Sequence, residues 1–315
     1  MNLLKTFWIS KNVAFGPIPI RSDYEDVIEH FDVVVSLIEK EEYKLYSYKP
    51  EYFKEKGNLE VYKIYTTDYR APKLLPSLEI LQKILEYDLQ NKKVYIHCVG
   101  GLGRSGALAA AYLVYKDGMK ADEAIKKIRK IRPGSVQSEE QKAFVQRVYT
   151  ATFGVNKEKI SKIASKAKEI LEKNTFILVN KRTEISMDLV WGLFREESLG
   201  PIAFVSSLAY FGILSNNLIE LSLENYNIFS QKDNINDPEK RETIEMIIKF
   251  SDEVVKEVGD GIAYFNVENL PSEIIFTAYC LTYCEDVIKA SFEKFKANMG
   301  RSLQKEVTVS VEYVW

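Results

Sequence analysis

The order of hydrophobic and polar positions in the first half of the chain predicts short buried strands alternating with amphipathic helices. Runs rich in β-branched and aromatic residues are typical of buried strands, and apolar residues at helical spacing indicate helices between them. The expected strands cover 31–39, 60–66 and 92–98, and the expected helices cover 23–30, 76–91, 104–118 and 121–134. Strands separated by helices imply an α/β fold, with a central, mostly parallel sheet flanked by helices.

Two capping boxes mark expected helix starts. Ser22 to Glu25 fits such a box before the first helix, and Ser138 to Gln141 fits one that opens a further helix. In this motif the first side chain and the fourth each accept a backbone N–H of the other residue.

The second half predicts another domain. Residues 153–174 have helical spacing and many lysines, so they either cap the first domain or link it to a second. We therefore divide the chain into 1–152, a helical linker or cap at 153–174, and an α+β domain at 175–315. Within the last part, apolar runs lie at 175–180 and 218–223, helices are expected near 196–215 and over 238–257 and 271–298, and strands at 261–267 and 305–315.

One stretch of the second half raises the question of a membrane. No charged residue lies between Glu197 and Glu220, but the stretch contains Pro201, glycines, serines and asparagines. A spanning helix needs about 20 predominantly apolar residues. We therefore interpret this stretch as a buried helix and expect no membrane association.

Composition excludes several classes of protein. The 315 residues carry 43 basic and 45 acidic side chains, a net charge of −2, whereas nucleic-acid-binding proteins usually show a basic excess. Three cysteines and two histidines leave no disulfide framework and little material for a zinc site. The start of the chain lacks the apolar core of a signal peptide, so a cytoplasmic location, with no metal and no cofactor, is the expectation.

The chemistry concentrates in a glycine-rich turn between the strand ending at Cys98 and the helix beginning at Arg104. A free cysteine titrates near pH 8.5, and only its thiolate is a good nucleophile. The helix N-terminus favours an anion there, and a backbone freed by glycines can turn several N–H groups inward. Arg104 adds a planar fork for two oxygens of one phosphate, and Ser105 can donate a hydroxyl to the sulfur. The loop positions are Val99, Gly100, Gly101, Leu102 and Gly103.

This turn has two plainer interpretations. A lone cysteine is usually a small core residue, and the turn could be only a turn. The ATP-type phosphate loop ends in Gly-Lys-Ser/Thr, which is absent here. The pattern His-Cys-x-x-Gly-x-x-Arg-Ser-Gly, in contrast, fixes six identities over residues 97–106, between a strand and a helix. A nucleophile at the base of an anion cradle therefore predicts attack on phosphorus.

The motif HCVGGLGRSG resembles the signature of the protein tyrosine and dual-specificity phosphatases, especially the compact archaeal ones. The resemblance, which covers roughly residues 5–150, implies that Cys98 forms a phosphocysteine and that Arg104 clamps the phosphate. It further implies that Ser105 eases release of the thiolate and that His97 tunes the loop. The segment RPGSVQSEEQ resembles the later glutamine motif of this family, which implies that Gln137 orients the hydrolytic water and Gln141 supports it.

A general acid is also needed, because the leaving oxygen must take up a proton as the P–O bond breaks. Asp68 follows the second strand, so its loop should reach the same sheet edge as Cys98, and in the resembling family the acid occupies this place. The alternatives are that Asp68 only starts a turn, and that Gln141 is only part of its capping box.

Two further segments have competing interpretations. Residues 39–58 are long and tyrosine-rich, and we interpret them as a charged surface loop, the alternative being that they wall the pocket or recognise the substrate. Cys280 and Cys284 are expected four apart on one helix face, as buried core thiols rather than a redox pair.

The sequence thus predicts a metal-independent phosphatase acting on phosphorylated protein, phosphotyrosine first and phosphoserine or phosphothreonine next. Positions 99–103 carry no lysine to meet extra phosphates, which disfavours a phosphoinositide substrate, and an RNA 5′-phosphate is a weaker alternative. The competing class is a non-catalytic phosphate-recognition module. For residues 175–315 we expect a substrate-selecting, interdomain or dimerising role, so that the chain could form a homodimer.

Overall fold

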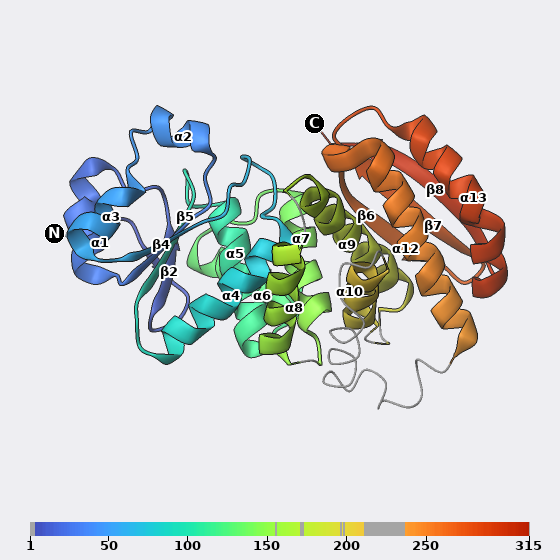
Figure 1. Ribbon diagram of the computed structural model, residues 1–315, viewed down its shortest axis with the longest axis horizontal. Helices are drawn as coiled ribbons and strands as arrows, with labels where there is room; N and C mark the ends of the chain where they lie inside the picture. Colours follow the sequence, from blue (N-terminus) through green and yellow to red (C-terminus); the bar gives the residue numbers. More distant parts are fainter. Residues whose placement is uncertain are drawn as a thin grey trace. The chain divides into compact units, whose positions relative to one another are not determined.

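The computed structural model describes residues 4–154, 156–170, 173–195, 197, 199–210 and 237–314. The chain divides into two compact units, residues 1–149 and 150–315 (Figure 1). Each unit has its own sheet, and each is described by itself.

Unit 1 is built on a five-stranded sheet in the order β1-β2-β5-β3-β4. β1 is antiparallel to β2, and all other neighbours are parallel, so the predicted α/β fold with a mostly parallel sheet is confirmed. The strands are β1 (Phe7–Trp8), β2 (Val13–Gly16), β3 (Val33–Ser36), β4 (Glu60–Lys63) and β5 (Val94–His97).

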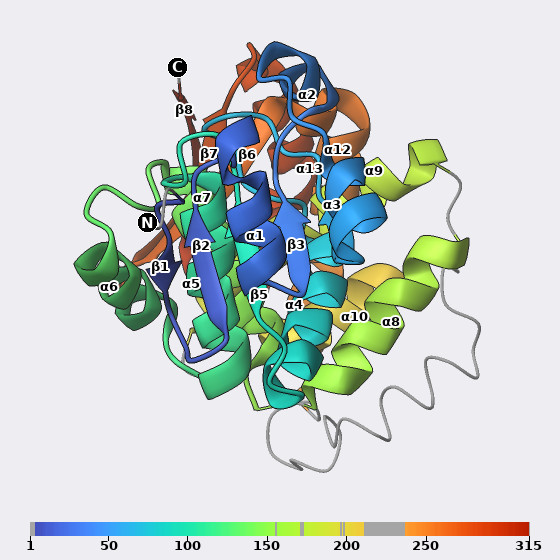
Figure 2. The ribbon, with the colours of Figure 1, turned by 90° about the vertical axis from the view of Figure 1, so that its left-hand side faces the viewer.

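Helices cover both faces of this sheet. α1 and α3 lie on one face, and α4, α5 and α6 lie on the other (Figure 2). Because β3 and β5 are central, every one of their side chains is buried, which explains their continuous apolar runs. The helices are α1 (Tyr24–His30), α2 (Lys40–Leu45), α3 (Pro50–Gly57), α4 (Leu74–Leu89), α5 (Arg104–Asp117), α6 (Ala121–Ile131) and α7 (Glu139–Thr152).

The strand register brings four strand ends to one edge. Gly16 and Ser36 are both paired with His97, and Lys63 is paired with Ser36. The loops that follow β2, β3, β4 and β5 therefore begin side by side, at the carboxyl edge where ligands bind to such sheets.

Two local expectations for unit 1 are wrong. Ser22 does not cap the first helix; α1 begins after Asp23, whose carboxylate accepts the backbone N–H of Ile20 at 3.0 Å. Residues 39–58 are not a surface loop but contain α2 and α3, with Tyr48 and Phe53 buried. The second capping box does form: Ser138 Oγ accepts the Gln141 N–H at 3.2 Å, and Gln141 Oε1 accepts the Ser138 N–H at 3.4 Å.

Unit 2 combines a three-stranded sheet with long helices. The sheet has the order β6-β7-β8, with β7 antiparallel to β6 and parallel to β8. Phe250, Phe265 and Phe292 pack edge-to-face in its core. The elements are α8 (Lys157–Ile170), α9 (Lys173–Leu193), α10 (Gly200–Ala209), α12 (Pro238–Val258), β6 (Ile262–Asn269), β7 (Glu273–Cys280), α13 (Glu285–Leu303) and β8 (Glu306–Tyr313).

One predicted helix of unit 2 is wrong, at a place where a short apolar run precedes a helix. The helix expected over 271–298 is in fact β7 followed by α13, because the buried run EIIFTAYC pairs with both β6 and β8. Cys280 therefore ends a strand and Cys284 precedes a helix, although both are buried free thiols, as expected.

Other expectations for unit 2 meet the structure only in part. The run 175–180 lies inside α9, and the helix near 196–215 corresponds to α10 as far as the chain is described. Residues 218–223 lie outside the described residues. In the described ranges no helix is both long and apolar enough to cross a membrane. The linker role of 153–174 and the roles expected for 175–315 stay predictions.

Candidate active site

The predicted nucleophile lies at the bottom of a loop at the carboxyl edge of the unit 1 sheet. The Cys98 loop (residues 98–104) joins β5 to α5, and Cys98 itself is only 2% exposed. Its Sγ accepts the backbone N–H of Gly101 at 3.2 Å and lies 3.3 Å from Ser105 Oγ. One backbone N–H and one hydroxyl therefore face the sulfur, an arrangement that can stabilise an anion.

Glycine is required at position 101 of this loop. Gly101 has φ +65°, and a Cβ there would lie 2.2 Å from the carbonyl carbon of Gly16. The loop thus packs directly on the end of β2, and Val99 accepts the N–H of Ile18 at 3.0 Å. Any side chain at Gly101 would push the loop off the sheet.

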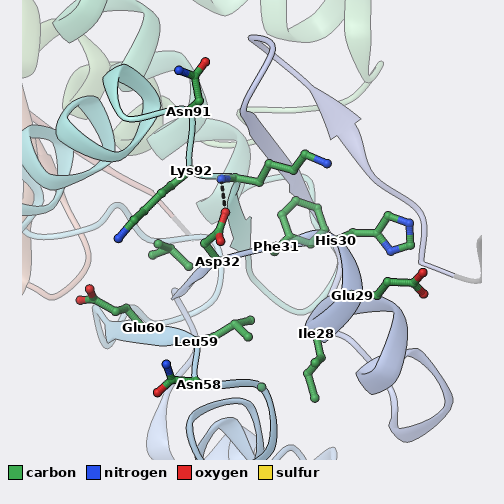
Figure 3. Close-up of a pocket in the computed structure, with 13 residues that line it drawn as sticks. Ile28, Glu29, His30, Phe31, Asp32, Asn58, Leu59, Glu60, Asn91 and Lys92 are labelled. Atoms are coloured by element: carbon green, nitrogen blue, oxygen red, sulfur yellow. Dashed lines mark hydrogen bonds between the residues drawn. The ribbon is translucent and has the colours of Figure 1, made fainter.

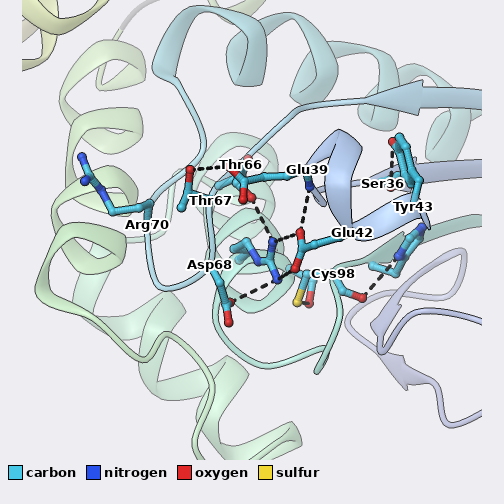
Figure 4. A network of polar contacts seen from close by, with 12 residues as sticks. Ser36, Glu39, Glu42, Tyr43, Thr66, Thr67, Asp68, Arg70 and Cys98 are labelled. Atoms are coloured by element: carbon cyan, nitrogen blue, oxygen red, sulfur yellow. Dashed lines mark hydrogen bonds and ion pairs between the residues drawn. The ribbon is translucent and has the colours of Figure 1, made fainter. Parts of the chain in front are cut away.

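Arg104 begins α5 and is 1% exposed. Its Nη1 donates to Glu42 Oε2 at 2.6 Å and to the Thr66 carbonyl at 2.9 Å, and its Nη2 donates to Glu42 Oε1 at 3.0 Å. Nη2 also lies 3.1 Å from Asp68 Oδ1 (Figure 4). The buried Nε has no hydrogen-bond partner among the described residues.

The Arg104–Glu42 pair is ionised at neutral pH. Burial by itself would raise the pKa of Glu42, but the hydrogen bonds from Arg104 lower it below its ordinary value. Burial likewise opposes the charge on Arg104, and the bonds to Glu42 raise its pKa. The bidentate geometry fixes the plane of the guanidinium as well as its charge.

The predicted acid, Asp68, is brought close to Arg104 but remains accessible, with its side chain 62% exposed. The loop that carries it is tied to the start of α7. Ser138 Oγ donates to the Tyr69 carbonyl at 2.7 Å, and Gln141 Nε2 donates to the Arg70 carbonyl at 3.2 Å. Asp68 is therefore an open side chain on an anchored loop, where it could reach a bound ligand.

The two predicted glutamines lie beside the Cys98 loop. A Cβ on Gly103 would lie 2.7 Å from Gln137 Oε1 and 2.9 Å from Gln141 Nε2. Gln141 is buried, and its Oε1 accepts the N–H of Gln137 at 2.8 Å, whereas Gln137 is exposed. The side-chain amide of Gln141 thus holds the backbone of Gln137 in place, and the Gln137 side chain lies beside Gly103 of the Cys98 loop.

His97 is fully buried and hydrogen-bonded on both ring nitrogens. Nε2 lies 2.8 Å from the hydroxyl of Tyr48, and Nδ1 lies 3.3 Å from the carbonyl oxygen of Cys98. Burial is the main cause that lowers the pKa of His97 to about 3. The imidazole is therefore neutral at physiological pH and positions the start of the loop without adding charge.

The structure adds three residues that the sequence did not single out: Glu42, Tyr48 and Thr66. Glu42 and Tyr48 belong to the segment 39–58, which contacts both His97 and Arg104. The alternative interpretation of that segment, a wall of the site, therefore describes it better than a surface loop. The density of tyrosines is the only feature of this segment's sequence that suggests a role in the site. Nothing in the local spacing identifies Glu42 as the partner of an arginine 62 residues away.

A separate cavity of about 680 Å³ lies at the amino edge of the same sheet (Figure 3). Its lining includes Asp32, Leu59 and Lys92, which precede or begin β3, β4 and β5. None of the predicted site residues lines it. In the described parts of the chain, no group of three or more His, Cys, Asp or Glu side chains could hold a metal ion.

Comparisons with known proteins relate unit 1 to phosphatases. A model of the dual specificity phosphatase catalytic domain matches residues 25–151. Protein tyrosine phosphatase domain-containing protein 1 of Bos taurus is 42% identical over 96 residues, which are 30% of this chain and 12% of that protein. Phosphatidylglycerophosphatase and protein-tyrosine phosphatase 1 of Homo sapiens is 30% identical over 130 residues, 39% of this chain and 63% of that protein.

Among solved structures, Tk-PTP in its active form is 36% identical, covers 46% of this chain and 95% of its own, and has a TM-score of 0.43. The match spans only 12–13% of the length of protein tyrosine phosphatase domain-containing protein 1 from three vertebrates.

Because His97 is buried neutral, it should make stability depend on pH. Its pKa is 6.5 when exposed and about 3 when folded, so below pH 6.5 the unfolded chain binds a proton that the folded chain does not. Stability from this group is complete above pH 6.5 and is lost as the pH falls. Between pH 7 and pH 5, the free energy of unfolding should drop by about 2 kcal/mol more for the wild type than for His97→Asn.

Urea unfolding at the two pH values measures this difference. An equal pH dependence in the two proteins would show that His97 is not held neutral.

Proposed function

We propose that this chain hydrolyses phosphotyrosine in proteins through a phosphocysteine intermediate. Its residues 25–151 form a domain of the cysteine-dependent protein tyrosine and dual-specificity phosphatase superfamily. One observation carries the proposal: the Cys98 sulfur faces the Gly101 N–H and the Ser105 hydroxyl, in a loop that ends at the buried guanidinium of Arg104.

In the first step, the Cys98 thiolate attacks phosphorus. An S–P bond forms and the P–O bond to the leaving group breaks, and Asp68 gives its proton to the leaving oxygen. The backbone amides of the loop, among which the Gly101 N–H faces the sulfur, and the Arg104 guanidinium bind the equatorial oxygens. They stabilise the charge on these oxygens as the geometry at phosphorus becomes trigonal.

In the second step, a water molecule attacks the phosphocysteine. Gln137 orients the water through its amide, and Asp68, now a carboxylate, accepts a proton from it. The S–P bond breaks and inorganic phosphate leaves. Ser105 donates a hydrogen bond from its hydroxyl to the Cys98 thiolate that is released. Gln141 supports Gln137 from below, and neutral His97 holds the backbone of Cys98.

Phosphotyrosine is the substrate we favour. Positions 99–103 of the loop carry no lysine that would bind further phosphates of a phosphoinositide. The human relative bears a name that joins a phosphatidylglycerophosphatase to a protein-tyrosine phosphatase, so a lipid phosphate is the alternative to exclude. A role as a non-catalytic phosphate reader is disfavoured because nucleophile, arginine and acid lie together.

Substitution of the nucleophile and of the acid should separate the two steps. On a phosphotyrosine peptide without added metal, Cys98→Ser should abolish turnover, and Asp68→Ala should lower kcat about 10²- to 10⁴-fold, because the phenolate then leaves unprotonated. The pH profile of kcat/KM should be bell-shaped in the wild type and should lose its alkaline limb in Asp68→Ala. Asp122→Asn, an exposed carboxylate of α6, is the control. Full turnover by Cys98→Ser would disprove the mechanism.

Glu42 should affect activity by positioning the guanidinium of Arg104. Glu42→Gln keeps the shape but removes the charge and half of the bidentate acceptor, so the guanidinium should lose its fixed plane. We expect kcat/KM on the same peptide to fall about 10- to 100-fold, a loss typical of a misplaced catalytic group. Glu41→Gln, the exposed neighbour on α2, should retain full activity. Equal activity of the two variants would mean that Glu42 does not position Arg104.

A further inference from the structure

The sheet of unit 2 ends at β6 on one side, and this edge is covered by side chains of α9. Lys181 Nζ donates to the Ala263 carbonyl at 3.3 Å, and Asp188 Oδ2 accepts the Phe265 N–H at 3.1 Å. These backbone groups belong to the side of β6 that is turned away from β7. The helix therefore occupies the place that a further strand would take beside β6.

The opposite edge of the same sheet, β8, is open within the described part of the chain. The Glu306 N–H donates to the Ser272 carbonyl at 3.2 Å. Because a parallel ladder alternates, the even-numbered residues of β8 turn their backbone groups to β7 and the odd-numbered residues turn theirs outward. No described residue makes a hydrogen bond to the outward groups of Val307, Val309 and Val311.

β8 also lacks the features that usually protect an exposed edge strand. Such strands are commonly short, bulged, or interrupted by lysine or proline. β8 is 8 residues long, its pairing with β7 is continuous, and its sequence EVTVSVEY contains neither lysine nor proline. β6, in contrast, has an irregular register between Ile262 and Tyr264. The β8 edge is therefore a template on which another strand can pair.

The apolar residues of β8 are arranged symmetrically about Ser310. Val309, Val311 and Tyr313 pack against the core between the sheet and its helices, but they are only partly buried there. Two antiparallel copies of β8 that meet at Ser310 would place Val309 opposite Val311 and Val307 opposite Tyr313. Cross-strand pairs of this kind stabilise a sheet, and these would extend the apolar layer of one copy into the other.

Charge favours this register over its neighbour. Glu306 and Glu312 are the charged residues of β8, and both are exposed. In a pairing centred on Val309, Glu306 would lie directly opposite Glu312 of the other copy, and like charges in that position are destabilising. In the pairing centred on Ser310, Glu312 lies opposite the neutral Thr308.

Helix α13, which joins β7 to β8, carries charges of both signs on its side toward the β8 edge. α12 lies between α9 and α13 (Figure 1), and Lys294 of α13 pairs with Glu253 of α12. Lys289, Glu293 and Lys296 recur at helical spacing on the side of α13 away from α12, and all three are well exposed. A row of alternating sign can pair with its own antiparallel copy.

We propose that β8 pairs with β8 of a second copy of this chain, antiparallel and about a two-fold axis at Ser310, so that the two unit 2 sheets join into one. A two-fold interface uses the same patch on both copies, which the symmetry of β8 satisfies. The proposal gives a surface to the homodimer expected from the sequence, and it does not depend on the phosphatase function.

Charges placed at the axis test this interface in the full chain. Analytical ultracentrifugation over a series of concentrations should show the wild type with twice the mass of one chain. Ser310→Lys and Ser310→Glu each bring two like charges face to face, so each alone should lose the dimer. An equal mixture of the two variants should regain it, because opposite charges then meet. Glu268→Lys, on the covered strand β6, is the control and should stay dimeric.

A cysteine at the axis gives a second measurement. Ser310 would meet its copy as a pair without mutual hydrogen bonds, with Cα atoms about 4.5 Å apart, a separation that a disulfide can span. The native cysteines are buried. Under mild oxidation by copper and air, Ser310→Cys should migrate as a covalent dimer on a non-reducing gel, and Glu268→Cys should migrate as a monomer.

Three results would overturn the proposal. A wild type that is monomeric at every concentration shows that β8 does not pair. A dimer that persists in Ser310→Lys, or that forms no cross-link in Ser310→Cys, uses another surface. Folded variants, checked by circular dichroism, that lose the dimer separately but do not regain it when mixed show that the loss does not come from charges meeting at the axis. If the charged variants do not fold, the Ser310→Cys cross-link decides.

Discussion

The bidentate ion pair between Arg104 and Glu42 is the constraint on which the rest of the site depends. A guanidinium that is 1% exposed needs a compensating carboxylate, because an unpaired buried charge is very costly. Glu42 supplies this charge from α2, and it occupies both Nη atoms while leaving Nε without a partner. The pair thereby fixes the plane of the guanidinium at the start of α5, the helix that follows the Cys98 loop. Thr66 and Asp68 complete the arrangement from the neighbouring loop, so that elements following β3, β4 and β5 converge on one side chain.

The sheet explains why these elements can converge. Pairing of Gly16, Ser36 and Lys63 in register with the end of β5 places four loops at one edge. The glycine at position 101 lets the Cys98 loop rest directly on β2, and the buried neutral His97 anchors the start of that loop to Tyr48. Each of these contacts is short and internal to unit 1, which makes the anion cradle a property of the folded domain before any substrate arrives.

The sequence was sufficient to predict those parts of the site whose residues lie close together in the chain. The strand, loop and helix around Cys98 follow one another directly, so their spacing predicted the cradle. Asp68 was predicted from the end of its strand together with the family resemblance, and Gln137 from the resemblance alone. Glu42 and Tyr48 could not, because their partners lie 62 and 49 residues away and a charged, tyrosine-rich segment resembles a solvated loop. In unit 2, the short buried run of β7 has no clear period, so the sequence predicts a helix there, and only the pairing with β6 and β8 identifies a strand.

The central claim, that the sulfur of Cys98 carries the phosphoryl group, can be tested by trapping the intermediate. The Gln137→Ala protein is mixed with a phosphotyrosine peptide, quenched in acid and digested, and the peptides are analysed by mass spectrometry. We predict a phosphoryl group on the peptide that contains Cys98, in an amount that rises relative to the wild type because hydrolysis of the intermediate is slowed. Phosphate release by the wild type with no phosphoryl group on Cys98 in either protein, or with the group on another residue, would contradict the account.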